Sequence, residues 1–360
     1  MWIILLFLNW WNTKKNWHMN AIVRKLKLYR ISTVLNYCRN SWDNSAFVIK
    51  QCPSKSRFSV FVDLLYWYIF YGNDFNDYCT FTFWNKSIAE RKAYISLRRN
   101  DVLRYTFSTP EVYELFLDKA KFNQRFRKYI NRGWLTTVNK SWDEIVKFII
   151  QYRDVIAKPL KDYGGHGVFR ICTSSDNYKY VLDILEQKII TGEQFIIEEI
   201  ITNCEKLKNL APGSLNTIRI VTVLDREKQL HILAALLRMG NGVALTDNYH
   251  DGGMACVIDS EKSILKGDAY GMNCARYEVH PYSHIKFDGF IIPHFDECIS
   301  IIKEIVYYEP DARYVGWDLA IAQNGIELLE GNIPPGEDIT QIASGCGLWY
   351  KMQAWKLYMN

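Results

Sequence analysis

Short apolar segments rich in β-branched residues recur between residues 154 and 322, and this recurrence constrains the fold more than any other feature. Glycine, proline or polar residues bound each segment, which is typical of strands in a sheet. The predicted strands are 154–160, 167–173, 194–201, 217–225, 230–239, 253–260 and 314–322. Helical patterns intervene at 141–153, 176–190 and 295–308. Strands and helices mixed in this way predict an α+β or mixed α/β catalytic body.

The chain before these strands shows helical rather than strand patterns. Residues 58–72 and 87–101 have helical patterns, and 108–130 opens with Thr109 as an N-cap and Pro110 at the first helical position. We therefore predict two regions. Residues 1–107 form a mainly helical, aromatic-rich and basic N-terminal region, and residues 108–360 form the catalytic domain.

Charge, cysteines and the N-terminus limit the partners and the location. Residues 1–160 hold 26 Lys/Arg against 12 Asp/Glu, so this part of the chain could face a membrane surface, an acidic glycan or nucleic acid, or it could have an ordinary basic surface without such a partner. No compact arginine-rich motif favours nucleic acid. Nine scattered cysteines without a C-x-x-C motif predict reduced thiols and a cytoplasmic location. The opening "MWIILLFLNWWNTKKNW" is too short to span a bilayer, which leaves peripheral membrane contact or packing on the body.

A predicted hairpin at 314–332 carries two carboxylates, Asp318 and Glu330, in an otherwise almost wholly apolar sequence. A two-residue Asn-Gly loop would put these acids on opposite faces, whereas a three-residue loop ending at Gly325 would pair them. Paired acids in a buried sheet repel unless a proton or a cation joins them. Mg²⁺ or Mn²⁺ suits such oxygen ligands, and Asn332 on the same face would add a third.

The segment "AKPLKDYGGHGV" (157–168) places Lys158 at a strand end before a turn that contains Gly164, Gly165 and Gly167. Glycines allow backbone N–H groups to approach phosphate oxygens, and a nearby lysine adds charge. A Gly-rich turn between two strands, without a ligand, is the simpler alternative.

Two further strands carry charges at unusual places. "FIIEEII" (195–201) ends in Glu198 and Glu199, which strand alternation sends to opposite faces. Such a strand end could bind an adenine through its backbone groups and a ribose through one carboxylate. Alternatively, the two acids are simply solvated. "GSLNTIRIVTVL" (213–224) surrounds Arg219 with apolar residues, so its guanidinium must meet a carboxylate or a bound anion.

These elements in this order resemble the ATP-grasp superfamily, in which two α+β lobes hold ATP between antiparallel sheets. The narrower resemblance is to the sugar-transfer-associated ATP-grasp family, which is related to α-L-glutamate ligases. The segments that carry it are "YGNDFNDYCTFTFW" (71–84), "DKAKFNQRF" (118–126), "SLNTIRIVT" (214–222) and "LLEGNIPPG" (328–336).

The resemblance implies a role for each candidate residue. The ligands of Mg²⁺ would be Asp318, Glu330 and Asn332. The implied contacts to ATP are Lys119, Lys158, Gly164, Gly165, Gly167, Glu198, Glu199, Ile200 and Ile201. Arg219 and Lys158 would stabilise the transferred phosphoryl group. The substrate pocket would include Asn216, Asn248, Gly252 and Gly253.

The implied reaction is ligation of a carboxylate to an amine acceptor, driven by ATP through an acyl phosphate, in the synthesis of a surface polysaccharide or envelope glycan. A phosphotransferase on the same fold and a non-catalytic scaffold for glycan enzymes remain as alternatives. The sequence does not separate ligase from kinase chemistry, because both need the same metal site.

Overall fold

A computed structural model describes residues 31–161, 167–242, 252–271 and 275–355. The chain forms two compact units, residues 1–70 and residues 71–360. The first contains α3 (Ile31–Gln51) and most of α4 (Arg57–Tyr71). In this unit Val60, Leu64 and Trp67 of α4 are buried, and the rings of Tyr37 and Tyr68 stack with centroids 3.7 Å apart.

A seven-stranded antiparallel sheet forms the centre of the second unit, in the order β11-β10-β5-β6-β7-β8-β9. Its strands are β5 (Thr217–Leu224), β6 (Leu230–Met239), β7 (Met254–Asp259), β8 (Ile264–Gly271), β9 (Arg276–Tyr277), β10 (Tyr314–Ala322) and β11 (Gly325–Asn332). Every residue of β5 is buried, because helices cover both faces of the sheet there.

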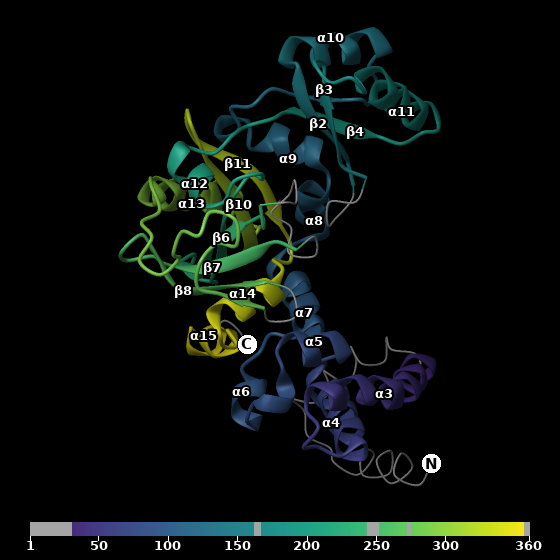
Figure 1. Cartoon of the computed structure of the whole chain (residues 1–360), viewed down its shortest axis with the longest axis vertical. Coiled ribbons are helices and arrows are strands. Elements are labelled where there is room, and N and C mark those ends of the chain that lie inside the picture. The colour runs from purple at the N-terminus through teal and green to yellow at the C-terminus, as the bar shows by residue number, and fades with distance from the viewer. Residues whose placement is uncertain (1–30, 162–166, 243–251, 272–274, 356–360) are drawn as a thin grey trace. The chain divides into compact units, whose positions relative to one another are not determined.

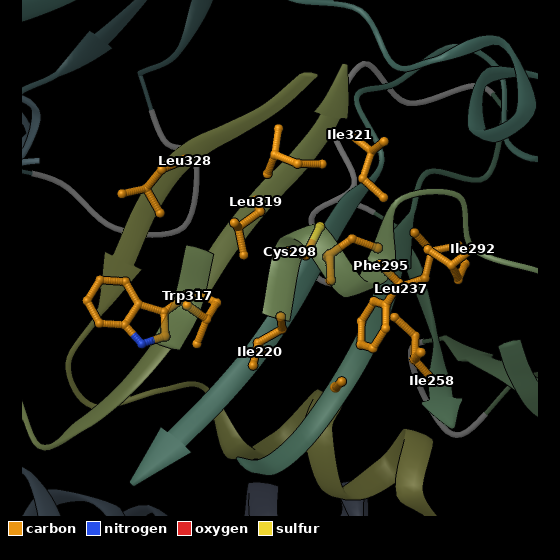
Figure 2. Packing of buried hydrophobic residues seen from close by; sticks show 14 of the residues in the cluster. Ile220, Leu237, Ile258, Ile292, Phe295, Cys298, Trp317, Leu319, Ile321 and Leu328 are labelled. Atoms are coloured by element: carbon orange, nitrogen blue, oxygen red, sulfur yellow. The ribbon is translucent and has the colours of Figure 1, made fainter. Parts of the chain in front are cut away.

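One face packs against α8 (Pro110–Leu117), α9 (Lys119–Arg125), α12 (Glu205–Leu210) and α13 (Phe295–Tyr308). Figure 2 shows Phe295 and Cys298 of α13 among side chains of the sheet, including Ile220 and Leu237. The opposite face packs against α7 (Leu97–Phe107), α14 (Glu337–Ser344) and α15 (Trp349–Ala354). Alternate residues of the strands supply the two cores, as the pleat requires.

A smaller antiparallel sheet has the order β1-β4-β2-β3. Its strands are β1 (Trp134–Thr136), β2 (Asp154–Pro159), β3 (Phe169–Cys172) and β4 (Phe195–Glu199). Figure 1 shows helices α10 (Trp142–Tyr152) and α11 (Tyr178–Ile190) beside this sheet. Their apolar residues share a buried core with its strands. Two antiparallel sheets with their helices, preceded by a helical region, confirm the predicted α+β architecture.

All of the predicted strands are present, and β1, β8 and β9 are additional. The single helix predicted at 87–101 is wrong. The segment forms α6 (Ile88–Lys92) and α7 instead, and Ser96 caps α7 by accepting a hydrogen bond from the N–H of Arg99. The backbone between the two helices is not helical. There the side chain of Gln341 accepts a hydrogen bond from the N–H of Ile95 and donates one to its carbonyl oxygen.

The segment 108–130 is likewise divided. Thr109 caps α8 and Pro110 begins it, as predicted, but Asp118 then ends α8 and caps α9. The remaining short helices are α5 (Phe75–Thr80), η1 (Phe83–Asn85) and η2 (Arg127–Tyr129). By their contacts α5, α6 and α7 belong to the second unit, although the sequence assigns them to the N-terminal region. Across the described ranges, no helix is both long and apolar enough to cross a membrane.

Candidate functional site

The hairpin of β10 and β11 places Asp318 directly opposite Glu330. From the sequence, this pairing was expected only if a three-residue loop joined the strands. The structure has a two-residue loop instead, because Ala322 pairs with Gly325.

A β-bulge produces the observed register. The pair Leu319–Leu328 is followed by the pair Asp318–Glu330, so Leu329 is an extra residue in β11. Directly paired residues lie on the same face of a sheet. The two carboxylates therefore share a face, and the bulge rather than the loop brings them together.

Asp318 is buried and already meets two positive charges. Arg219 bonds it through Nε to Oδ1 and through Nη2 to Oδ2 at 2.7 Å, and Arg238 Nη1 lies 3.1 Å from Oδ2. Burial alone would raise the pKa of Asp318, but the guanidinium of Arg219 and then that of Arg238 hold it below its usual value. The carboxylate that Arg219 was predicted to need is thus Asp318. The expectation that Asp318 and Glu330 would repel each other unless a proton or a cation joined them is therefore wrong for Asp318. Its charge is compensated by Arg219 and Arg238 without a metal.

Asn332 lies between the two acids. Its Nδ2 is 3.3 Å from Asp318 Oδ2 and 3.1 Å from Glu330 Oε1. The amino group thus stands where two carboxylates converge, which is where a cation would be attracted. Exchange of the amide nitrogen and oxygen would present three oxygens to one point. The residues fit an oxygen-ligated divalent ion, although among the described residues no group of three His, Cys, Asp or Glu side chains could hold a metal.

A buried charge network joins the two sheets. Arg132 donates from Nη2 to Glu198 Oε1 on β4 at 2.6 Å and from Nη1 to Glu327 Oε1 on β11 at 2.8 Å. Lys158 on β2 lies 2.7 Å from Glu198 Oε2. Burial raises the pKa of Glu198, but Arg132 and then Lys158 overcome this and hold it well below its usual range. No sequence motif marks Arg132 as part of this network. The one available signal was Glu327, an isolated acid in an apolar hairpin.

One small cleft of about 30 Å³ is lined by five predicted residues: Lys119, Lys158, Glu198, Glu330 and Asn332. Phe116 and Asn123 contribute to the same cleft. Two lysines therefore lie beside the acid–amide end of the hairpin. The space is too small for a nucleotide, but these charges suit phosphate oxygens and an ion between them.

A second cleft has a volume of about 590 Å³, which lies within the range of cofactor sites. The predicted residues that line it are Lys158, Glu198, Glu199, Ile200 and Ile201. Strands β2, β3 and β4 contribute part of the wall, together with the segments 200–203 and 213–215 and Leu329 of β11. Because Lys158, Glu198 and Leu329 also line the small cleft, the two clefts adjoin.

Other predicted residues lie elsewhere. Asn216 is fully buried, and its Nδ2 donates to the carbonyl oxygens of Leu207 and Ala211 at 3.1 and 2.7 Å, so it holds the turn before β5. Gly252 and Gly253 precede β7 and line neither cleft described above.

In the Gly-rich loop, Gly167 has a φ of +68°, and a Cβ at this position would lie 3.1 Å from Cγ of Pro159. Its companions Gly164 and Gly165 lie outside the described residues, as do Asn248 and the N-terminal segment 1–17.

Two antiparallel sheets that both contribute to these clefts define the ATP-grasp class of fold. Within that class, residues 98–356 match the sugar-transfer associated ATP-grasp family, and the chain belongs to it.

Several known proteins have a similar sequence or structure. A glutathione synthetase from Anaplasma centrale is 49% identical over 41 residues, which are 11% of this chain and 13% of that protein. D-alanyl-alanine synthetase A from Vibrio cholerae has a TM-score of 0.45 at 12% identity, covering 70% of this chain and 68% of that one. The ATP-grasp ligase PsnB, in complex with a minimal precursor, has a TM-score of 0.42 at 13% identity, covering 69% and 62%.

Proposed function

We propose that this protein is an ATP- and Mg²⁺-dependent ligase that joins a carboxylate to an amine through an acyl phosphate. The observation that carries the proposal is the convergence of Lys119, Lys158, Glu330 and Asn332 on one cleft that adjoins a cleft of nucleotide size. Membership of a sugar-transfer associated family supports a glycan-linked substrate in surface polysaccharide or envelope synthesis.

Each residue has a role in this proposal. Lys119 and Lys158 bind phosphate oxygens of ATP, while the larger cleft takes the adenine and the ribose. Asp318, Glu330 and Asn332 hold Mg²⁺ or Mn²⁺, which would shield phosphate charge and polarise the γ-phosphate. Lys158 also pairs with Glu198 at 2.7 Å, so its ammonium group is fixed before a nucleotide arrives.

Arg219 keeps its proposed electrostatic role, with a constraint from its contacts. Its Nε and Nη2 bond Asp318, and its Nη1 lies 3.9 Å from the position that a Cβ on Gly336 would take. Arg219 therefore orients Asp318 and adds positive charge beside it, where phosphate charge develops.

The proposed reaction has two balanced steps. A carboxylate oxygen of the donor substrate attacks the γ-phosphorus, the bond to the β-phosphate oxygen breaks, and ADP leaves. The nitrogen of the acceptor amine then attacks the acyl carbon, inorganic phosphate leaves with the bonding electrons, and the amine loses a proton. No protein nucleophile is required.

Product analysis separates this proposal from its alternatives. Purified protein is incubated with ATP and Mg²⁺ and a panel of amino acids, sugar acids and nucleotide sugars, and ADP and phosphate are measured. A ligase releases ADP and free phosphate in equal amounts only when both substrates are present. A phosphotransferase releases ADP without free phosphate. A protein that neither binds nor hydrolyses ATP, with Mg²⁺ or with Mn²⁺, is a scaffold and contradicts the proposal.

A peripheral membrane contact is the second part of the proposal, and α4 supports it. Phe58, Val62, Tyr66 and Phe70 recur every four residues along α4 and are 64%, 47%, 41% and 45% exposed. They form a ridge about 18 Å long. Residues 1–70 contain ten Lys/Arg and two Asp/Glu, which favours anionic lipid headgroups as the partner of this ridge.

Vesicle sedimentation tests the membrane contact. Vesicles of phosphatidylcholine with 30% phosphatidylglycerol should sediment the full-length protein, and replacing Phe58, Tyr66 and Phe70 by serine should release most of it. The control replaces Tyr180 and Ile190 of α11, which are 68% and 69% exposed, by serine and should change nothing. Self-association through α4, or equal sedimentation of both variants, would contradict the lipid assignment.

A further inference from the structure

Three buried polar side chains of the second unit have atoms without a hydrogen-bond partner, and none of them belongs to the clefts above. Asn73, Asn100 and Glu337 are only 1%, 7% and 4% exposed. Four of their atoms have no hydrogen-bond partner among the described residues. These atoms are Nδ2 and Oδ1 of Asn73, Oδ1 of Asn100 and Oε2 of Glu337. A buried polar atom without a partner costs about 1–3 kcal/mol, so four in one region require an explanation.

The first turns of α7 bring these side chains to one junction. The N–H of Leu97 donates to Asp77 Oδ2 of α5 at 3.2 Å. One turn further along, Asn100 Nδ2 donates to the carbonyl oxygen of Pro335 at 2.7 Å, two residues before Glu337. The segment that contains Asn73 leads directly into α5, and α5 also contacts α14.

The placement of the unpartnered atoms does not depend on how the amides are assigned. Exchanging oxygen and nitrogen in Asn100 would set its oxygen against the carbonyl oxygen of Pro335, which cannot form a hydrogen bond. For Asn73 both atoms lack a partner, so exchange changes nothing. Oε1 of Glu337 accepts from the hydroxyl of Tyr314, which leaves Oε2 as the unpartnered oxygen.

These atoms favour a ligand that donates hydrogen bonds. Asn73 Oδ1, Asn100 Oδ1 and Glu337 Oε2 are acceptors, whereas Asn73 Nδ2 is the single donor. The arrangement of charge agrees with this. Asp338 lies beside Glu337 in the sequence, and Asp77 lies within range of the charge of Asp338.

Burial and neighbouring acidic groups raise the pKa of two carboxyl groups at this junction. Burial, and then the charge of Asp338, raises the pKa of Glu337 to about 7 against the opposing effects of Tyr314 and Arg219. Burial, and then the charge of Asp74, raises the pKa of Asp77 to about 7. An ammonium group would stabilise both anions.

The junction also adjoins the proposed reaction centre. Gly336 precedes Glu337, and a Cβ at Gly336 would lie 3.9 Å from Nη1 of Arg219, whose other nitrogens bond Asp318. A group held at the junction is therefore close to the charges that were assigned to the phosphoryl transfer.

We propose that Asn73, Asn100 and Glu337 form the binding site for the amino group of the acceptor substrate. This inference rests on the proposed ligase function and identifies the acceptor as a cationic amine that also carries hydroxyl or carbonyl groups for Asn73. The segment "YGNDFNDYCTFTFW", which the ATP and metal sites do not use, thereby acquires a role in substrate recognition.

Calorimetric titration of the full-length protein tests the site with ethanolamine, glycine and glucosamine as probes. Each probe is titrated at pH 8 with and without Mg²⁺ and a non-hydrolysable ATP analogue. The wild-type protein should bind at least one amine saturably, and the double variant Asn73→Ala/Asn100→Ala should bind it at least about tenfold more weakly, because hydrogen bonds to a charged group are lost. Asn85→Ala, an exposed amide in the same region, should bind the amine like the wild type.

A second variant protects the test against misfolding. Glu337→Gln keeps the shape of the side chain, so it should retain the analogue affinity and the fold but lose at least about tenfold in amine affinity. Equal amine binding by Glu337→Gln and the wild type, or no amine binding with or without the analogue, would overturn the inference. Failure to bind the analogue, by contrast, would overturn the proposed function and would be recorded separately.

Discussion

Replacing Arg132 by methionine tests whether the buried network holds the two sheets together. The side chains of Arg132, Glu198 and Glu327 are 3–4% exposed, so the substitution leaves two carboxylates without their shared guanidinium. Removing one partner of a buried ion pair typically costs about 3–5 kcal/mol. For a unit of this size that corresponds to a fall in Tm of roughly 6–20 °C, measured by calorimetry or circular dichroism.

The matched control is Arg170→Met, which breaks an ion pair on the small sheet. Arg170 and its partner Asp154 are 49% and 31% exposed, so the loss should stay below about 1 kcal/mol. Adding Glu198→Gln and Glu327→Gln to Arg132→Met should recover part of the stability, because the uncompensated charges are gone. If Arg132→Met costs no more than Arg170→Met, the network does not stabilise the fold.

Three further predictions concern the hairpin and the junction. Glu330→Gln should lower Mg²⁺-dependent ADP release at least about 100-fold with little change in Tm, and unchanged turnover would remove Glu330 from the metal site. Asp318→Asn should lower the Tm more than Glu330→Gln does, because it weakens the buried partner of Arg219; equal Tm values would contradict this. Glu337→Gln should gain stability relative to the wild type as pH rises from 5 to 8. Burial raises the pKa of Glu337 in the folded protein to about 7 from a usual 4.5, so the wild type loses about 2.5 kcal/mol of stability between pH 5 and pH 8. Parallel urea-denaturation profiles of the two proteins would contradict the shift.

Periodicity was sufficient for the longer strands and for α10, α11 and α13, because their apolar faces are continuous in the sequence, but it missed short elements such as β1 and β9. It failed at 87–101, where the helix is interrupted. The interruption is stabilised by Gln341, whose side chain bonds both backbone groups of Ile95 across almost 250 residues of chain. A contact between residues so far apart in the sequence cannot be predicted from a local pattern.

The candidate site divides in the same way. Lys158 and Glu330 stand in short motifs that are readable one segment at a time, and the structure brings them to one cleft. Arg132 was not found, because its partners Glu198 and Glu327 are 66 and 195 residues away. The β-bulge was also missed, since Leu329 is an ordinary apolar residue of an apolar strand.

The bulge at Leu329 makes the acidic end of the hairpin a property of the whole unit. Its irregular backbone offers the carbonyl oxygens of Leu328 and Leu329, and Arg132 donates to them at 2.7 and 3.2 Å. Arg132, almost 200 positions away in the sequence, thus stabilises the strand register that places Glu330 opposite Asp318. Residues 314–332 excised as a peptide, or grafted onto another sheet, would lack that support and would be free to adopt another alignment of the two acids.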